Sequence, residues 1–444
     1  MKRRVVIPTA VRRPGQFVLT MAALLLSAGA ASADEATLTP LAQLGKQVFF
    51  DKGLSMTGTQ SCASCHAPDV GFSGPDEQFN RMGAYPGALH GTFGKRKPQT
   101  AAYVGSSPIL HVEVQGGTPT FVGGSFWDGR ATGHRLNDPL AEQAQGPLLN
   151  SVEQALPDSV CVVQRACAGE YASLVRTLSP GTCEIPALSA VQCVAGQETK
   201  LGPEARAAIS NGFDLLARAV DAYEESPEVS AYSSKYDAWK AGKAELTAQE
   251  LAGLAVFNGK GKCGNCHVEA APPAGGPGVN GALFTDFTYD NLGVPRNPLN
   301  PWYQQPGNPQ GRSWVDLGLG GFLQTEDQWR QYAEQNMGRM KVPTLRNVDK
   351  RPQPGFVKSY MHNGYFTSLE NVVSFYNTRD VKPRCPNAFT PESEAVAQGC
   401  WPEPEVPQTV NRKELGNLQL TADEERALVA FMKTLSDGLA GAAR

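Results

Sequence analysis

The stretch Cys62-Ala63-Ser64-Cys65-His66 has a second copy later in the chain, Cys263-Gly264-Asn265-Cys266-His267. Both copies have the pattern C-x-x-C-H, which is the attachment signature of a c-type haem. Two thiols three residues apart on one tight turn can add to the two vinyl groups of a porphyrin, and the imidazole that follows can coordinate its iron. The alternative is a redox or zinc-binding C-x-x-C followed by histidine by chance, and two copies argue against it. The sequence therefore predicts two covalently bound haem c groups.

The N-terminal segment, residues 1–33, has the pattern of a secretory signal peptide. Basic residues at 2–4 precede an apolar stretch at 17–30 that is too short and too rich in small residues for a membrane span. Because haem is attached covalently after export of an unfolded chain, we expect Sec export to the periplasm, with cleavage after Ala33. The twin arginine at 12–13 is a weaker signal for Tat export. No later apolar stretch approaches about 18 residues, so no membrane span is expected after signal removal.

The net charge argues against a nucleic-acid-binding protein, and the cysteine count indicates disulfides. The formal net charge of −3 argues against nucleic acid as a partner. Of the ten cysteines, four lie in the haem motifs and six remain, an even number that predicts disulfides in an oxidising compartment. Cys385 with Cys400 would close one loop. Three connectivities stay open for the other four, which are Cys161, Cys167, Cys183 and Cys193.

Apolar residues at helical spacing recur along most of the chain. They predict helices over residues 39–49, 136–155, 160–178, 204–223, 247–257 and 421–435. Thr247 and Glu250 have the spacing of a capping box, and acidic residues follow Thr421 at the start of the last helix. Stretches rich in Gly and Pro predict loops at 67–120, 271–281 and 297–321. The predicted fold class is therefore mainly α, with long loops and little β structure.

The two motifs suggest a duplicated organisation. Residues 45–53 align with 253–261, each just ahead of a haem motif, as in duplicated cytochrome c modules. We therefore expect two cytochrome c-like domains, each holding one haem. Their expected bounds, with the connecting segment between them, are 34–200 for the N-terminal domain, 201–245 for an interdomain crossing and 246–444 for the C-terminal domain.

Several stretches outside the haem motifs carry a family resemblance. The most specific is Phe126-Trp127-Asp128-Gly129-Arg130-Ala131, and the others read EQAQGP at 142–147, NSVE at 150–153, NLGVP at 291–295, KVPTLRNV at 341–348 and HNG at 362–364. With the two motifs, they make the chain resemble the bacterial dihaem cytochrome c peroxidase/MauG family over essentially its whole mature length. The resemblance implies an enzyme that reduces hydrogen peroxide at the N-terminal haem and draws electrons through the C-terminal haem.

The resemblance also assigns roles to single residues. It makes His66 the proximal ligand of the peroxidatic haem and His267 that of the second haem. Trp127 matches the tryptophan between the two haems, a relay for electrons or holes, although a core aromatic residue is the alternative for such a side chain. Gln143 and Glu153 match the pair in the distal pocket. Glu153 would take a proton from bound peroxide and return it to the leaving oxygen.

Tyr376 departs from the peroxidase branch of the family. Fourteen residues after His362, ordinary members have methionine as the second axial ligand of the electron-storing haem, whereas tyrosine here resembles the MauG pattern. A thioether raises the potential of a haem, and a phenolate oxygen lowers it and favours oxidised iron. Tyr376 as an iron ligand would therefore suit sharing of the oxidising equivalents of peroxide across the tryptophan. The alternative is that Tyr376 only packs, with ligation by Met337, Met340 or Met361.

Two further family features are in doubt for this chain. Dihaem peroxidases often have a removable distal histidine ahead of an Arg-Asn-x-Pro-Thr-like stretch, and His90 precedes 96–100, so it is a candidate iron ligand or a loop histidine. The family also places calcium between the domains, with an asparagine as its side-chain ligand. Lys97 stands at that position, which makes calcium doubtful because an ammonium group cannot coordinate a cation. Carbonyl groups near Val357 and Ser359 could still contribute to a site.

Three functional hypotheses follow. The first is a peroxide-using dihaem oxidoreductase supplied by a small redox protein, either a c-type cytochrome or a cupredoxin, or one that oxidises a partner protein. The second is a dihaem electron-transfer cytochrome with two closed haems and no peroxide chemistry, which the pair Gln143 and Glu153 speaks against. The third is a disulfide-rich binding protein without haem.

Overall fold

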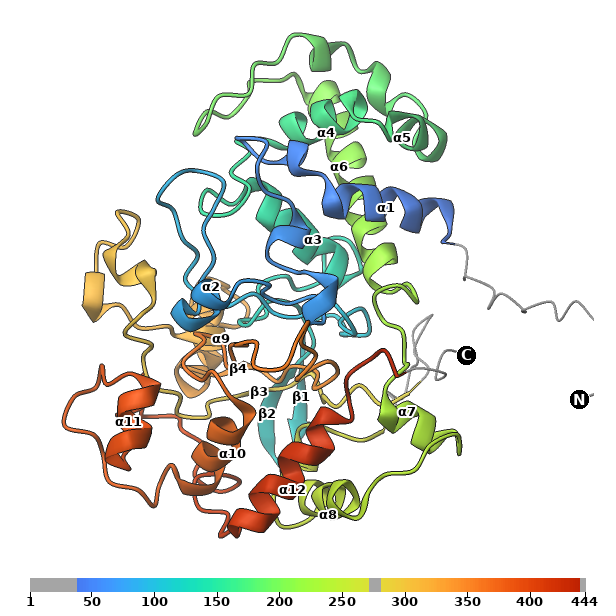
Figure 1. Ribbon diagram of the computed structural model, residues 1–444. Coiled ribbons are helices and arrows are strands. Elements are labelled where there is room, and N and C mark those ends of the chain that lie inside the picture. Colours follow the sequence, from blue (N-terminus) through green and yellow to red (C-terminus); the bar gives the residue numbers. More distant parts are fainter. Residues whose placement is uncertain (1–37, 271–280, 440–444) are drawn as a thin grey trace, which may run out of the picture. The chain divides into compact units, whose positions relative to one another are not determined.

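The computed structural model describes residues 38–270 and 281–439, so the predicted signal peptide at 1–33 and most of the predicted loop at 271–281 lie outside the described residues. The described part is mostly helical (Figure 1), as predicted. Its α-helices are α1 Pro40–Phe50, α2 Glu77–Met82, α3 Pro139–Leu149, α4 Ser159–Ala168, α5 Ala172–Leu178, α6 Pro203–Glu224, α7 Lys235–Lys240, α8 Ala248–Asn258, α9 Gly318–Leu323, α10 Leu369–Thr378, α11 Glu392–Gln398 and α12 Ala422–Lys433.

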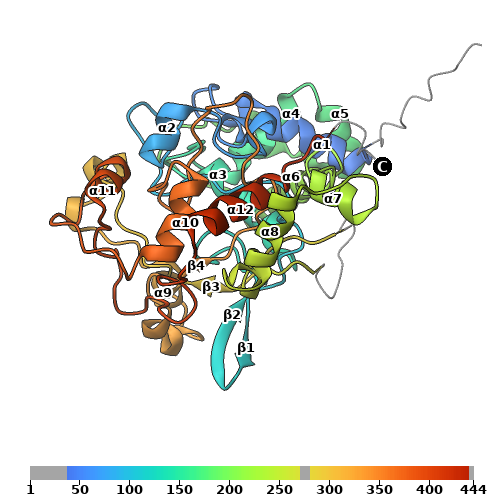
Figure 2. The ribbon, with the colours of Figure 1, turned by 60° about the horizontal axis from the view of Figure 1, so that its bottom comes forward.

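The strands are short and form two antiparallel pairs. Strand β1 (His111–Gln115) pairs with β2 (Thr118–Val122), and β3 (Tyr289–Asp290) pairs with β4 (Met340–Lys341). The hairpin of β1 and β2 extends away from the helices (Figure 2). Its first strand lies within a stretch that the sequence predicted as loop, because the turn glycines at 116 and 117 dominated the pattern.

Two predicted helices are wrong in their extent. The helix predicted at 136–155 covers only α3, since the Asp138 carboxylate caps its start by accepting from the backbone N–H of Leu140 at 2.8 Å and Asn150 leaves it in an extended conformation. The helix predicted at 160–178 is two helices, α4 and α5, because Gly169 between them is extended. The capping box of Thr247 and Glu250 is confirmed, with the Glu250 N–H donating to Thr247 Oγ1 at 3.2 Å.

Each haem motif follows a helix that crosses a later helix at very close range. Helix α1 packs against α6, and α8 packs against α12 (Figure 1). A Cβ on Gly45 would lie 1.7 Å from the carbonyl oxygen of Ala219, and a Cβ on Gly253 would lie 1.9 Å from that of Ala427. Only glycine permits either crossing. The two glycines occupy equivalent places in the aligned segments 45–53 and 253–261, so the repeat in the sequence corresponds to a repeated helix packing.

The apolar interior has two large clusters within the one compact unit that the chain forms from Leu38 onward. One cluster gathers side chains of α1, α3, α4 and α6, and its largest members include Phe49, Phe213 and Tyr223. The other gathers side chains of α8, α10 and α12 around Phe257 and Trp401. A smaller cluster lies under the β1–β2 hairpin. No helix in the described ranges is long and apolar enough to cross a membrane.

Disulfides form at all six cysteines outside the motifs, as predicted. Cys385 pairs with Cys400, the predicted loop closure. The structure selects one of the three connectivities left open for the other four, namely Cys161 with Cys193 and Cys167 with Cys183. These two bridges tie helix α4 to the segment that leads to α6.

Candidate functional site

A cavity of about 560 Å³ lies against the first C-x-x-C-H motif, within the range of cofactor pockets, about 300–1,000 Å³. The structure brings together there most of the residues that the sequence singled out for this half of the chain. The predicted residues that line it are Cys62, Cys65, His66, Trp127, Gln143 and Glu153.

The first motif forms one tight turn. The backbone N–H groups of Cys65 and His66 donate to the Cys62 carbonyl at 3.1 and 2.9 Å. His66 Nδ1 lies 3.3 Å from the carbonyl oxygen of Phe72. Because a carbonyl only accepts, Nδ1 carries the hydrogen and Nε2 keeps its lone pair. Burial lowers the pKa of His66 to about 4, which keeps the imidazole in the neutral form that binds metals.

The second motif repeats this geometry in a smaller cavity of about 210 Å³. The His267 N–H donates to the Cys263 carbonyl at 2.9 Å, and His267 Nδ1 donates to the carbonyl of Phe284 at 2.9 Å. Burial lowers the pKa of His267 as well. Both motifs therefore present a neutral imidazole whose Nδ1 is held by a phenylalanine carbonyl.

The four motif cysteines are the free cysteines among the described residues. Burial raises the pKa of Cys62, Cys263 and Cys266 to about 12 in each case, and it raises that of Cys65 further. All four are therefore neutral thiols on cavity walls, whereas the remaining six cysteines are disulfide-bonded.

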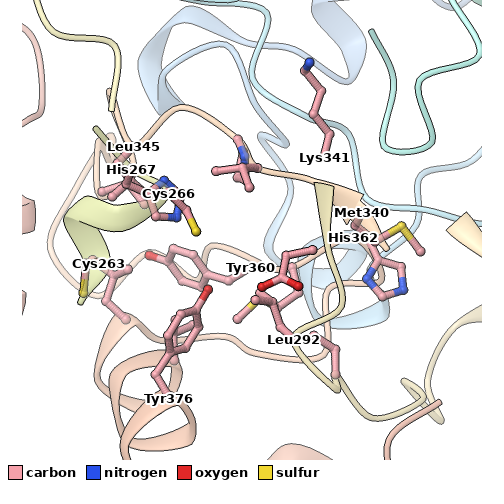
Figure 3. A pocket seen from close by; sticks show the side chains of 18 of the residues that line it. Cys263, Cys266, His267, Leu292, Met340, Lys341, Leu345, Tyr360, His362 and Tyr376 are labelled. Atoms are coloured by element: carbon pink, nitrogen blue, oxygen red, sulfur yellow. The ribbon is translucent and has the colours of Figure 1, made fainter. Parts of the chain in front are cut away.

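Tyr376 comes from helix α10 and points its hydroxyl into the second cavity, toward Cys266 and His267 (Figure 3). This hydroxyl makes no hydrogen bond to any other described residue. The neighbouring Tyr360 differs, because its hydroxyl accepts from Arg351 Nη2 at 3.1 Å and donates to Asp349 Oδ1 at 3.3 Å. Burial raises the pKa of Tyr376, so its phenol stays protonated unless a cation lies against the oxygen.

The methionine alternatives to Tyr376 are not equal in position. Met340 and Met361 line the same cavity as Tyr376. Met337 instead packs against the small apolar cluster under the hairpin and is absent from the cavity lining.

Trp127 lines both cavities and is 8% exposed. Its indole Nε1 donates to the carbonyl of Lys97 at 3.0 Å, and its ring centroid lies 6.4 Å from that of His362. The Trp127 carbonyl accepts from the Lys341 N–H at 2.9 Å. These bonds to segments from both halves of the chain fix the indole between the two cavities.

The predicted distal pair lies together on the wall of the first cavity. Gln143 extends from helix α3, and its side chain has no hydrogen-bond partner among the described residues. Glu153 Oε1 accepts from Asn150 Nδ2 at 2.9 Å. Burial raises the pKa of Glu153, against smaller opposing effects of Arg130 and Asn150. The raised pKa favours the protonated form of this carboxyl group.

A buried charge network beside Trp127 was not predicted. Arg96 donates to both carboxylate oxygens of Asp316 at 2.6 Å and to Asp128 Oδ2 at 2.6 Å. Asp128 follows the tryptophan directly, so the network anchors that segment. Asp316 lies 220 residues from Arg96 in the sequence, and no local pattern connects them.

His362 lines the second cavity, and one of its ring nitrogens has no hydrogen bond to a described residue. Its Nε2 is buried without a hydrogen-bond partner among the described residues and lies 3.6 Å from Glu405 Oε2. His90, in contrast, is exposed and does not line either cavity, so its placement gives no support to its candidacy as an iron ligand. His111 and His134 bond to the carbonyls of Ile109 and Leu110 in the hairpin region.

The residues at the expected calcium position do not fit a calcium ion. Lys97 Nζ donates to the Pro98 carbonyl at 3.1 Å, and the carbonyl of Val357 already accepts from Asn80 Nδ2 at 2.9 Å. The ammonium group of Lys358 lies in the same region. It donates to the carbonyls of Val70 and Lys350, at 2.7 and 2.9 Å, and to Ser73 Oγ at 3.2 Å. The buried amino group of Lys358 therefore joins these segments, and burial lowers its pKa to about 7.

Comparisons with known proteins agree with this geometry. The family model described as di-haem cytochrome c peroxidase matches residues 39–245. The chain is 33% identical over 420 residues to the methylamine utilization protein MauG of Paracoccus denitrificans (strain Pd 1222), covering 94% of each chain. It is 27% identical to the cytochrome-c peroxidase IdrP1 of Denitromonas iodatirespirans, covering 88% of this chain and 80% of the relative.

Among solved structures, the diheme peroxidase BthA from Burkholderia thailandensis E264 superposes with a TM-score of 0.68 at 28% identity. The match covers 92% of this chain and 90% of BthA. The chain therefore belongs to the di-haem cytochrome c peroxidase family that includes MauG, whose members carry two haem groups.

Proposed function

We propose that this chain is a di-haem c-type peroxidase or oxidase that reduces hydrogen peroxide in the N-terminal cavity. Electrons come through the C-terminal site from a small redox protein, a c-type cytochrome or cupredoxin, or from an oxidisable partner protein. One observation carries the proposal: Glu153 and Gln143 share a cavity with the first motif, and Trp127 lines both that cavity and the one with Tyr376. The names of the relatives, MauG and cytochrome-c peroxidases, support it.

The cavity residues fit covalently attached haem. Each cavity has two neutral thiols outside any disulfide on one turn and an imidazole whose Nδ1 is held by a backbone carbonyl. In the second cavity the Tyr376 hydroxyl and His362 Nε2 are further polar atoms without partners among the described residues. His66 and His267 would bind iron, with Tyr376 as the second ligand in the C-terminal site. A bound haem iron supplies the redox centre at which the O–O bond of peroxide is cleaved.

Glu153 acts as a proton carrier in this proposal. Asn150 holds Oε1, which leaves Oε2 to take a proton from hydrogen peroxide and return it to the leaving oxygen. Gln143, whose amide has no other partner among the described residues, can orient the peroxide through its two donors and its acceptor. Both side chains are half-buried in the cavity wall.

The domain division and the location belong to the same proposal. The two large apolar clusters support two domains, which we place at 34–200 and 246–444 with 201–245 between them, although helix α6 of that connecting segment packs into the first cluster. Periplasmic location, with Sec export and cleavage after Ala33, rests on the sequence pattern and on the disulfides, which form in oxidising compartments.

The decisive test is peroxide consumption by the purified holoprotein with a reduced small cytochrome or cupredoxin as donor. We expect Glu153→Gln to slow peroxide reduction by about 10²-fold or more, the usual contribution of a general acid–base group, with the haem spectra nearly unchanged. Glu170→Gln, which alters an exposed acid, is the matched control. Equal rates in the native protein and Glu153→Gln would remove Glu153 from the chemistry.

The same assay separates the competing functions. Fast steady-state turnover with the donor indicates peroxide detoxification, whereas slow turnover with modification of a partner protein indicates MauG-like oxidation. A protein with two covalent haems that neither binds cyanide nor consumes peroxide would be an electron-transfer cytochrome, the alternative function.

A further inference from the structure

A second acidic side chain lines the first cavity, and the mechanism above does not use it. Glu224 is the last residue of helix α6, is 6% exposed and contributes to the cavity wall. Its carboxyl group has no hydrogen-bond partner among the described residues. Besides burial, Glu224 and to a lesser degree Glu153 raise the pKa of the Cys62 thiol. The two carboxyl groups therefore lie close to the same motif cysteine.

Asp221 and Glu225 adjoin Glu224 at the end of helix α6, and Asp138 caps the start of α3, which packs against α6; none of the three lines the cavity. Burial and then Asp138 raise the pKa of Asp221 to about 9, and burial and then Asp138 raise that of Glu225 to about 7. Burial, followed by Glu225, raises the pKa of Glu224 itself to about 8. Asp221 Oδ1 is buried without a hydrogen-bond partner, an arrangement that a proton shared with a neighbouring carboxyl would satisfy. Asp221 and Glu225 are partly exposed, so the group extends from the cavity wall toward solvent.

The proposed reaction needs such a supply of protons. Reduction of peroxide follows H₂O₂ + 2 H⁺ + 2 e⁻ → 2 H₂O, with the electrons from the donor protein. Glu153 takes one proton from peroxide and gives the same proton back, so it adds none to the balance. Two protons per turnover must therefore reach the cavity from solvent, in addition to the proton that Glu153 moves within peroxide.

We propose that Glu224 is a second proton-donating group of the N-terminal cavity, and that Asp221, Glu225 and Asp138 connect it to solvent. The inference rests on the proposed peroxidase function. Glu224 gives its proton to the cavity and is recharged from its neighbours, while Glu153 carries out the internal transfer within peroxide. Sequence reasoning missed Glu224 because it is one acid among several at the end of a helix, and only the fold turns it inward.

The test uses the haem-loaded protein and its variants Glu224→Gln, Glu224→Asp and, as control, Glu228→Gln. Glu228 lies near the same helix end but at the surface, in an ion pair with Lys46. Infrared spectra without peroxide report the carbonyl band of a protonated, buried carboxyl group, which shifts in D₂O. We expect Glu224→Gln to lose one such band and to slow peroxide reduction by about 10²-fold, with a larger solvent isotope effect. Glu224→Asp should restore part of both, and Glu228→Gln should behave like the native protein.

The outcomes separate this inference from the proposed function. A band that persists in Glu224→Gln, or a native rate in that variant, would overturn the inference. If Glu224→Gln does not fold, Glu225→Gln removes the next carboxyl group: slowed reduction supports the route and a native rate overturns it. A native protein that consumes no peroxide would refute the proposed function, whereas normal consumption insensitive to Glu224 would refute only the role of Glu224.

Discussion

At the scale of single residues, the phenol of Tyr376 is the side chain that most clearly sets the two cavities apart. The first cavity has an amide and a carboxyl group, Gln143 and Glu153, where the second has this hydroxyl. Its pKa is raised by burial, so only a metal cation against the oxygen would make it a phenolate. The chemical difference between the sites therefore depends on whether this oxygen binds iron.

Replacement of Tyr376 by methionine tests that ligand. We expect Tyr376→Met to raise the reduction potential of the C-terminal haem, because a thioether favours reduced iron and a phenolate favours oxidised iron. Tyr360→Phe is the control, since it removes another hydroxyl from the same cavity wall. Spectroelectrochemical titration measures both potentials. An unchanged potential in Tyr376→Met would mean that Tyr376 is not the iron ligand and that Met340 or Met361 is.

The site could be predicted from sequence wherever the chemistry is local. The C-x-x-C-H turns place both thiols and the imidazole within five residues, and the stretch around Trp127 carries a specific family pattern. The partners of Arg96 and the cavity-facing position of Glu224 could not be predicted, because they depend on segments far apart in the sequence. His90, which the spacing left open as an iron ligand or a loop histidine, lies at the surface.

At the scale of elements, the repeated glycine crossing explains why the two halves resemble each other. Helices α1 and α8 approach α6 and α12 so closely that Gly45 and Gly253 meet backbone carbonyl groups. The sequence predicted the helices and the Thr247 cap correctly because periodicity and capping are local signals. The predicted helices at 136–155 and 160–178 are too long, because the apolar pattern continues past Asn150 and Gly169, where the helices end. The sequence missed the β1–β2 hairpin, which shares a small apolar cluster with residues of α9.

Adding a methyl group at either crossing tests this packing. We expect Gly45→Ala and Gly253→Ala each to lower the free energy of unfolding by about 1–3 kcal/mol, the usual cost of overpacking. Gly307→Ala is the control, because a Cβ there meets only an ordinary contact, Trp302 Cη2 at 3.8 Å, and the backbone is outside the left-handed region. Urea unfolding followed by circular dichroism gives the comparison. Native stability in both crossing variants would mean that the helices shift apart freely.

At the scale of the whole molecule, buried ionisable groups join distant segments and make stability depend on pH. Lys358 joins segments near residues 70 and 350, and Arg96 joins Asp128 to Asp316. Glu224 makes stability fall as the pH rises, because burial raises its pKa from 4.5 to about 8. The folded state therefore binds its proton more tightly than the unfolded state does. Its stabilising contribution is complete below about pH 4.5 and is lost as the pH rises to about 8.

This sign gives a prediction for the unfolding free energy. Between pH 4.5 and about 8, the unfolding free energy should fall by a few kcal/mol less in Glu224→Gln than in the native protein, since the neutral amide has no proton to lose. Denaturant titrations of the native protein and the variant at several pH values measure it, with Glu228→Gln as the surface control. Parallel pH profiles for the native protein and Glu224→Gln would show that Glu224 is not a buried acid.

The central claim is that the N-terminal site is open to peroxide while the C-terminal site is closed. Electron paramagnetic resonance and optical spectra of the oxidised holoprotein, before and after cyanide and then stoichiometric peroxide, test it most directly. We predict one high-spin ferric haem that binds cyanide and reacts with peroxide, and one low-spin haem that binds neither molecule. Two low-spin haems, both inert to cyanide and to peroxide, would contradict the account.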